Sequence, residues 1–256
     1  MSTCSKRPER FQNFLTPKLL GSPHACLPGS LLAKASIIKF DMAEIEKNIK
    51  SADIQFHDAF HYESTQLAWR PSASFESVAN YVAREYCSAD LIITSAMTND
   101  HGVAERVQAG DIIMQSGRPV LIAPASTHSL DRNHIVITWK NTREARRTVV
   151  DALPLLKLAN QVTLLQLAEE HQRDQVSERQ RQMVEWLFGH DVVAQTKFVP
   201  LTGDTDADQL DVVLTEMRCD AVIAGAYGHS RMREWALGGV TRNLLLDGRR
   251  WTLLSH

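Results

Sequence analysis

The sequence predicts an α/β fold of two doubly wound domains, each with a five-stranded parallel sheet, of which the first is incomplete. From residue 134 onward, short β-branched apolar runs alternate with helical patterns. This order implies parallel strands joined by right-handed crossovers. Part of the pattern also occurs about 130 residues earlier, as expected of a two-copy chain. We therefore predict an irregular segment 1–35, a degenerate first domain 36–130 and a second domain 131–256.

The second half supplies the clearest elements. His134–Trp139 is an apolar run typical of a strand, and Thr142 is placed to cap the following helix. Pro154 is expected to kink or end the last turn of that helix. Further strands are expected at 162–167, 192–199, 221–225 and 251–254, and further helices at 172–188, 206–218 and 241–246.

The first half keeps only part of this pattern. Ser88–Ile93 aligns with Arg218–Ile223, and Gly117–Ile122 with Gly248–Leu253. Ser95 and Thr98 stand where Gly225 and Gly228 would be, so this half is expected to keep a sheet and lose a glycine loop. Upstream we expect poor order to about residue 33, strands at 36–40 and 66–70, and helices at 42–61 and 75–86.

Composition points to a cytoplasmic protein. The net charge of −2 gives no case for a nucleic-acid or anionic-membrane partner. No apolar run approaches the roughly 20 residues of a membrane span, and no signal peptide is apparent. The four scattered cysteines lack a C-x-x-C spacing, which favours reduced thiols over a metal site or a disulfide.

The most informative motif lies near the C-terminal end. Gly225-Ala226-Tyr227-Gly228 directly follows an apolar run, and Gly238-Gly239 precedes a helix expected from Thr241. A strand, a glycine-rich turn and a helix form an arrangement that binds phosphate through backbone N–H groups. His229 lies inside this loop and can touch a ligand or be solvated. The alternative for the whole loop is a tight turn selected for packing.

Other charged motifs have plainer interpretations. Asp204–Asp208 lacks the glycine and glutamate of a calcium loop, and helix capping explains it better. His57 and His61 have no third metal ligand nearby. Glu144 and its neighbouring arginines are expected on a solvated helix face. No metal site and no catalytic constellation is predicted.

The glycine motif, with its nine-residue spacing to Gly238, resembles the signature of the universal stress proteins, in particular their tandem bacterial members. Trp139–Arg147 and Gly239–Arg242 also resemble that group, as does Gly117–Leu121 in the first half. The resemblance is specific over 131–256, weaker over 62–127 and absent over 1–35. It implies an adenine nucleotide alpha hydrolase-like fold, often dimeric through the last strand.

Some members of that family bind ATP, and they share no common reaction. The resemblance implies that Gly225, Gly228, Gly238 and Gly239 hold the phosphates, with the backbone at Thr138 and Trp139 beside the base or ribose. Two positions depart from the ATP-binding pattern. Lys140 stands where an acidic residue is found, and Gly239 stands where Ser or Thr is found, with Thr241 the nearest hydroxyl.

The sequence thus predicts an adenine-nucleotide-binding stress-response protein without a dedicated reaction, with ATP as the ligand. Its two domains are expected to form a pseudo-dimer, and a homodimer is also considered. Lys140 can pair with a phosphate as a point charge but cannot accept a hydrogen bond from a ribose. The alternative is a nucleotide-free interaction module of the same fold. A weak phosphohydrolase is a third hypothesis, for which no base can be nominated.

Overall fold

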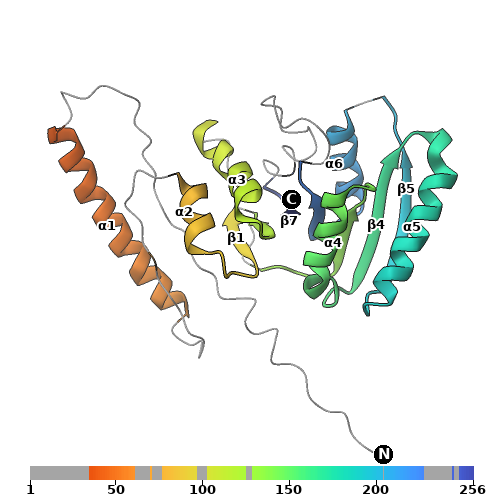
Figure 1. Ribbon diagram of the computed structural model, residues 1–256, viewed down its shortest axis with the longest axis horizontal. Coiled ribbons are helices and arrows are strands. Elements are labelled where there is room, and N and C mark those ends of the chain that lie inside the picture. Colours follow the sequence, from red (N-terminus) through yellow and green to blue (C-terminus); the bar gives the residue numbers. More distant parts are fainter. Residues whose placement is uncertain are drawn as a thin grey trace, which may run out of the picture. The chain divides into compact units, whose positions relative to one another are not determined.

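The computed structural model describes residues 35–60, 70, 77–96, 103–124, 129–203, 205–227, 244 and 248–256. The chain divides into two compact units, Met1–Ser77 and Val78–His256. The described part of the first unit is dominated by helix α1 (Ala35–Phe60) (Figure 1).

The strand expected at 36–40 is wrong, because these residues belong to α1. The segment contains no glycine or proline, and its apolar residues continue at helical spacing through Ile38, Met42, Ile45 and Ile49. The helix expected from residue 42 is therefore real but begins earlier. The strand expected at 66–70 lies outside the described residues except for Arg70, which is in neither a helix nor a strand.

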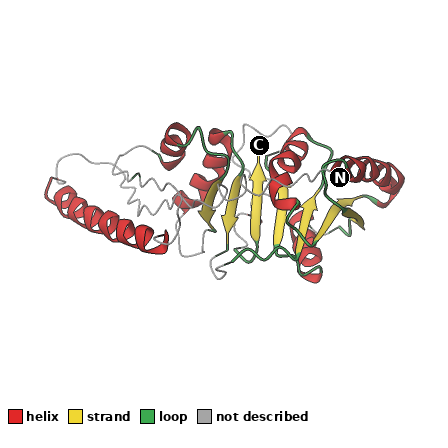
Figure 2. Ribbon diagram, turned by 90° about the horizontal axis from the view of Figure 1, so that it is seen from below, coloured by secondary structure: helices red, strands yellow, loops and turns green. Residues whose placement is uncertain are grey.

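The described part of the second unit is built on one sheet of seven strands in the order β1-β2-β7-β6-β3-β4-β5 (Figure 2). Neighbouring strands are parallel except for β2 and β7, which are antiparallel. The strands are β1 (Ile92–Ser95), β2 (Val120–Ala123), β3 (His134–Thr138), β4 (Gln161–Ala168), β5 (Ala194–Pro200), β6 (Ala221–Gly225) and β7 (Trp251–Ser255).

The α-helices whose full bounds are described in this unit are α2 (Val78–Glu85), α3 (Val103–Ser116), α4 (Arg143–Leu156), α5 (Arg173–Phe188) and α6 (Asp206–Glu216), and a short 3₁₀ helix, η2 (Glu170–Gln172), precedes α5. Pro154 does not end α4, which continues to Leu156. Proline has no N–H, so Pro154 cannot donate the helical hydrogen bond to the carbonyl oxygen of Val150. Val150 is exposed, so water can donate to that oxygen instead. The helix expected at 241–246 lies outside the described residues except for Leu244, which is helical.

The last five strands in the chain form the doubly wound part of the sheet, with β3 and β6 at its centre. Helix α4 packs on β3, β6 and β7, while α5 packs on β4 and β5. The core beneath these helices is apolar, and it includes Ile135, Ile137, Leu164, Ile223 and Leu253. The buried Gln180 of α5 donates through Nε2 to the Leu164 and Lys197 carbonyl oxygens, at 3.1 and 3.2 Å, and thereby joins α5 to both strands.

The strands of the first half continue the same sheet. β2 pairs with β7 in an antiparallel register that places Val120 opposite Leu254 and Ile122 opposite Thr252. Gly117 precedes β2 and Gly248 precedes β7, and their φ angles are +59° and +57°. The two glycines that aligned in the sequence therefore have the same backbone conformation. One sheet spans both predicted domains, and the boundary between residues 130 and 131 remains a prediction.

Within the described ranges, no helix is both long enough and apolar enough to cross a membrane.

Candidate functional site

The carboxyl ends of β3 and β6 define the topological switch point of the sheet. The two strands are neighbours, with Thr138 opposite Ala224. From β3 the chain proceeds to β4 on one side, whereas from β6 it proceeds to β7 on the other. Ligands of open α/β sheets bind beyond the strand ends at such a point. The structure therefore brings Thr138 and Gly225, two of the predicted site residues, to the place where a ligand is expected.

Gly225 lies against the first turn of α4. A Cβ atom built on this glycine would be 2.5 Å from the Ala145 nitrogen and 2.8 Å from the Glu144 carbonyl carbon. These are backbone atoms and cannot rotate away, so only glycine fits between β6 and α4. The packing of α4 thus explains this glycine, and its predicted contact with a phosphate remains a prediction.

The first residues after β6 are bonded within the fold. The Ala226 N–H donates to the Ser255 carbonyl oxygen at 2.8 Å, and His256 Nδ1 lies 3.2 Å from the Ala226 carbonyl oxygen. Tyr227 has a φ of +60°, in the left-handed region, and its ring makes an edge contact with His256. Burial, assisted by the nearby Asp111, raises the pKa of Tyr227 to about 12. The Ala226 amide is thus not free to bind a phosphate here.

The residues that follow β3 face different surroundings. The Thr138 hydroxyl donates to the Ile223 carbonyl oxygen at 3.2 Å. Trp139 is only 5% exposed and packs in the apolar core, while its backbone N–H donates to the Leu165 carbonyl oxygen at 2.7 Å. Lys140 is exposed. The first of the two positions that depart from the ATP-binding pattern therefore carries a solvated cation.

The start of α4 contains one predicted and one unpredicted feature. Thr142 is the N-cap, as expected, and its hydroxyl oxygen accepts from the Ala145 N–H at 3.3 Å. Glu144, expected on a solvated face, is instead only 4% exposed. Burial raises the pKa of Glu144, but hydrogen bonds from Arg143, its own backbone N–H and Thr142 outweigh burial and hold the pKa below its usual value. Glu144 therefore carries a buried, ionised carboxylate, and its backbone lies against Gly225.

Several buried polar atoms near this point have no hydrogen-bond partner within the described ranges. They are Trp139 Nε1, Glu144 Oε2, Gln166 Oε1 and Ser255 Oγ. Sequence reasoning did not select Glu144, Gln166 or Ser255. Gln166 and Ser255 did carry a signal, because each is a polar residue inside or directly after an otherwise apolar strand run.

The remaining predicted loop residues lie outside the described residues. These are Gly228, His229, Gly238, Gly239 and Thr241. Their roles remain predictions.

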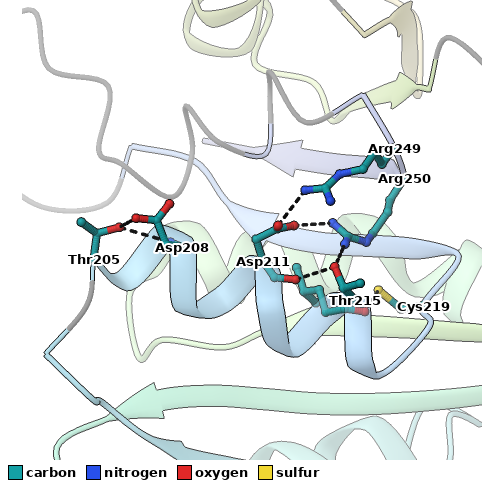
Figure 3. Close-up of polar contacts among 8 residues, drawn as sticks. Thr205, Asp208, Asp211, Thr215, Cys219, Arg249 and Arg250 are labelled. Atoms are coloured by element: carbon teal, nitrogen blue, oxygen red, sulfur yellow. Dashed lines mark hydrogen bonds and ion pairs between the residues drawn. The ribbon is translucent and has the colours of Figure 1, made fainter.

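The acidic motif before α6 is seen in part. Thr205 is the N-cap of α6, its hydroxyl donates to Asp208 Oδ2 at 2.6 Å, and Asp206 and Asp208 lie in the first turn (Figure 3). Asp204 and His61 lie outside the described residues. His57 is bonded through Nδ1 to the Asp53 carbonyl oxygen at 2.9 Å. In the described ranges, no group of three or more His, Cys, Asp or Glu residues is placed to hold a metal ion.

In sequence comparisons, no protein-family model and no curated protein matches the chain. Solved structures do match its fold. A universal stress protein from Archaeoglobus fulgidus DSM 4304 has a TM-score of 0.68 at 11% identity, over 88% of this chain and 82% of that one. A functionally unknown protein from Pseudomonas aeruginosa PAO1 has a TM-score of 0.53 at 12% identity, over 90% of both chains.

A third structure, a candidate universal stress protein from Pseudomonas aeruginosa UCBPP-PA14, has a TM-score of 0.53 at 15% identity, over 80% of this chain and 77% of that one. The protein thus has the mostly parallel α/β fold of the universal stress proteins. In the alignments the likeness extends over most of the chain rather than over one half.

Proposed function

We propose that the chain is a cytoplasmic member of the universal stress protein family that binds an adenine nucleotide and has no dedicated reaction. The observation that carries this proposal is the position of the glycine motif. β6 ends at Gly225 at the switch point of the universal stress protein fold, and in the sequence the motif continues to Gly228. A strand that ends in a glycine-rich turn at this point is suited to binding phosphate groups.

We also propose that the two halves are copies of one domain that form a pseudo-dimer. In this proposal β1 and β2 correspond to β6 and β7, because both are parallel pairs and the aligned Gly117 and Gly248 share a backbone conformation. The antiparallel pairing of β2 with β7 then joins the last strands of the two copies.

A nucleotide-free interaction module is the second candidate. Three observations favour it: the exposed Lys140 replaces an acidic residue, the Ala226 backbone groups are bonded within the fold, and packing alone explains Gly225. The two candidates differ in one measurable property, which is the affinity of the purified protein for ATP.

A thermal melt with and without millimolar ATP and magnesium tests the proposal. Binding to the folded state alone stabilises it by mass action, by about 2.7 kcal/mol when ATP is at about one hundred times its Kd. We therefore expect the melting temperature to rise with ATP concentration. The matched control is Gly228→Asp, which puts a carboxylate where phosphate is proposed to bind and should abolish the rise. An unchanged melting temperature together with no heat in calorimetry would favour the interaction module.

The absence of a dedicated reaction has its own test. Phosphate release from ATP by the wild-type chain should be no faster than release by Gly228→Asp. Turnover well above that control would contradict this part of the proposal and favour a phosphohydrolase.

A further inference from the structure

The exposed side of α4 carries several positive charges close together. Arg143, Arg146 and Arg147 are all exposed, and Lys140 is exposed just before the helix. Residues three and four apart lie on one face of a helix, so Arg143 shares a face with Arg146 and Arg147. We call Lys140, Arg143, Arg146 and Arg147 the basic face.

Carboxylates neutralise the basic face only in part. Arg143 Nε donates to Glu144 Oε1 at 2.5 Å, and Arg147 Nε lies 3.5 Å from Asp151 Oδ2. The Arg143 side chain is 77% exposed, whereas that of Glu144 is only 5% exposed. Lys140 and Arg146 have no ion pair within the part of the chain that the structure describes. The charge that this face presents to a partner is therefore positive.

These cations lie at the end of the helix where positive charge is unfavourable. The start of a helix has a partial positive charge, so carboxylates stabilise it and cations destabilise it. Helix α6 follows this rule, with Asp206 and Asp208 in its first turn. Helix α4 begins at Arg143 and has no basic residue in its last turn. Helix stability therefore does not explain the basic face, and its position points to a role in binding.

An exposed apolar side chain extends this surface. Val150 is 52% exposed, and it lies four residues after Arg146 and three after Arg147, on the same side of α4. Arg147 Nη2 also donates to the Gly117 carbonyl oxygen at 3.2 Å, which places the basic face beside the turn that precedes β2. The surface thus combines several cations with one apolar side chain, next to the junction of the two halves of the chain.

We propose that the basic face, together with Val150, docks an acidic segment of another protein in which carboxylates flank an apolar side chain. The planar guanidinium groups of arginine match carboxylates in charge and in geometry. The apolar side chain of the partner would pack on Val150. This proposal goes beyond the proposed function and does not depend on nucleotide binding.

A nucleic acid fits this surface less well than an acidic protein segment. Binding to a phosphate backbone depends on many lysine and arginine contacts along the strand. The basic face offers four cations, two of which already contact carboxylates of the chain, and the net charge of the chain is −2. A short acidic segment needs fewer contacts, and the exposed Val150 has no counterpart on a phosphate backbone.

Fluorescence anisotropy with a labelled synthetic peptide of glutamates interrupted by leucines tests the proposal. The test variant is Arg146→Glu, because Arg146 is exposed and reversing its charge breaks no described ion pair. We expect the full-length wild type to bind the peptide, and Arg146→Glu to bind it about fivefold more weakly. The difference should shrink as salt is added. A peptide with lysine in place of glutamate should not bind.

The melting temperature supplies a second measurement, which should move in the opposite direction. Arg146→Glu places a negative charge near the start of α4 and removes repulsion from Arg143, so we expect it to melt at a higher temperature than wild type. The matched control is Arg132→Glu. Arg132 is also exposed, but it precedes β3 and so lies at the opposite end of that strand from Lys140. This control should leave the affinity for the peptide unchanged.

Three results would overturn the proposal. The first is an acidic peptide that wild type does not bind at low salt, or binds no better than Arg146→Glu does. The second is a single-stranded oligonucleotide that binds more tightly than the peptide and is weakened by Arg146→Glu. The third is a wild-type dimer in sedimentation that Arg146→Glu dissociates, since a second copy would then occupy the basic face. The affinity for ATP should be the same in wild type and Arg146→Glu, so this proposal and the proposed function can fail separately.

Discussion

Gly225 is a residue whose identity packing alone explains, even though it lies where a ligand is expected. Replacing it with alanine would place a Cβ 2.5 Å from the Ala145 nitrogen, so β6 and α4 would have to separate. We expect Gly225→Ala to lower the free energy of unfolding by about 2 kcal/mol or more, as overpacked cores do. Urea unfolding followed by circular dichroism measures this change.

Gly189 provides the control for that substitution. It caps α5 at a φ of −63°, and a Cβ there would approach nothing closer than 3.4 Å, at the Trp186 carbonyl oxygen. Gly189→Ala should therefore change the unfolding free energy by less than about 1 kcal/mol. If Gly225→Ala were as stable as Gly189→Ala, α4 would be able to shift away from β6. Ligand binding rather than packing would then have to explain why residue 225 is glycine.

The same turn of α4 shows which residue roles could be predicted. Thr142 was predicted as a cap because capping depends on neighbouring residues alone. Glu144 is expected on the solvated face because its neighbours are charged, yet it is only 4% exposed, and its backbone packs against Gly225. The unpaired side-chain atoms of Gln166 and Ser255 are missed for a related reason. Which residues of neighbouring strands lie side by side depends on strand register, which a single sequence does not specify.

Helix α6 is tied to the start of β7 by one carboxylate and two guanidinium groups (Figure 3). Asp211 accepts from Arg249 Nη2 at 2.7 Å and from Arg250 Nη1 at 2.9 Å, and Arg250 Nη2 also donates to the Thr215 hydroxyl at 2.5 Å. Burial raises the pKa of Asp211, but the two arginines outweigh it and hold that pKa below its usual value. The charged form of Asp211 is therefore the one that the fold favours.

The pH dependence follows from the sign of that shift. A carboxylate with a lowered pKa stabilises the fold above its unfolded pKa of about 3.9, and this stabilisation is lost as the pH falls through the folded value. We expect Asp211→Asn to lower the free energy of unfolding by about 1 kcal/mol relative to wild type at neutral pH. The difference should disappear by about pH 2, if both proteins still fold there. Urea titrations at a series of pH values measure it.

An exposed ion pair serves as the control for Asp211. Lys157 Nζ lies 3.3 Å from Asp191 Oδ2, but the aspartate side chain is 89% exposed. Solvent screens such pairs, so Asp191→Asn should change stability by less than about 0.5 kcal/mol at any pH. If Asp211→Asn lowered the free energy of unfolding equally at every pH, the contacts of Asp211 with Arg249 and Arg250 would act through shape rather than charge.

The helices and strands are predicted well where the hydrophobic pattern and the turn-forming residues indicate the same boundaries, and poorly where they do not. In the second half, short apolar strand runs and amphipathic helices are separated by turns, and each described strand and α-helix lies close to its expected bounds. The run at 36–40 is short and apolar, which suits a buried strand or a helix equally. The apolar residues that follow it continue at helical spacing, which favours a helix and agrees with α1. This spacing is visible only when a longer stretch of sequence is considered.

At the scale of the whole molecule, the antiparallel pairing of β2 with β7 joins the two halves of the chain in one sheet. Leu253 and Leu254 of β7 are almost completely buried there. A fragment of residues 131–256 would keep β3 to β7 but expose the edge of β7 that β2 covers. An uncovered edge next to buried leucines favours pairing with another strand.

The β7 edge is therefore expected to pair with itself in the fragment. The family resemblance places dimer contacts at the last strand, and in this chain β2 occupies that position. We expect fragment 131–256 to sediment as a dimer that dissociates on dilution, with the second β7 replacing β2. The full chain at the same concentrations is the control, because its β7 edge is already paired. Circular dichroism checks that the fragment is folded. A folded fragment that stays monomeric at high concentration would contradict the prediction that a second β7 replaces β2.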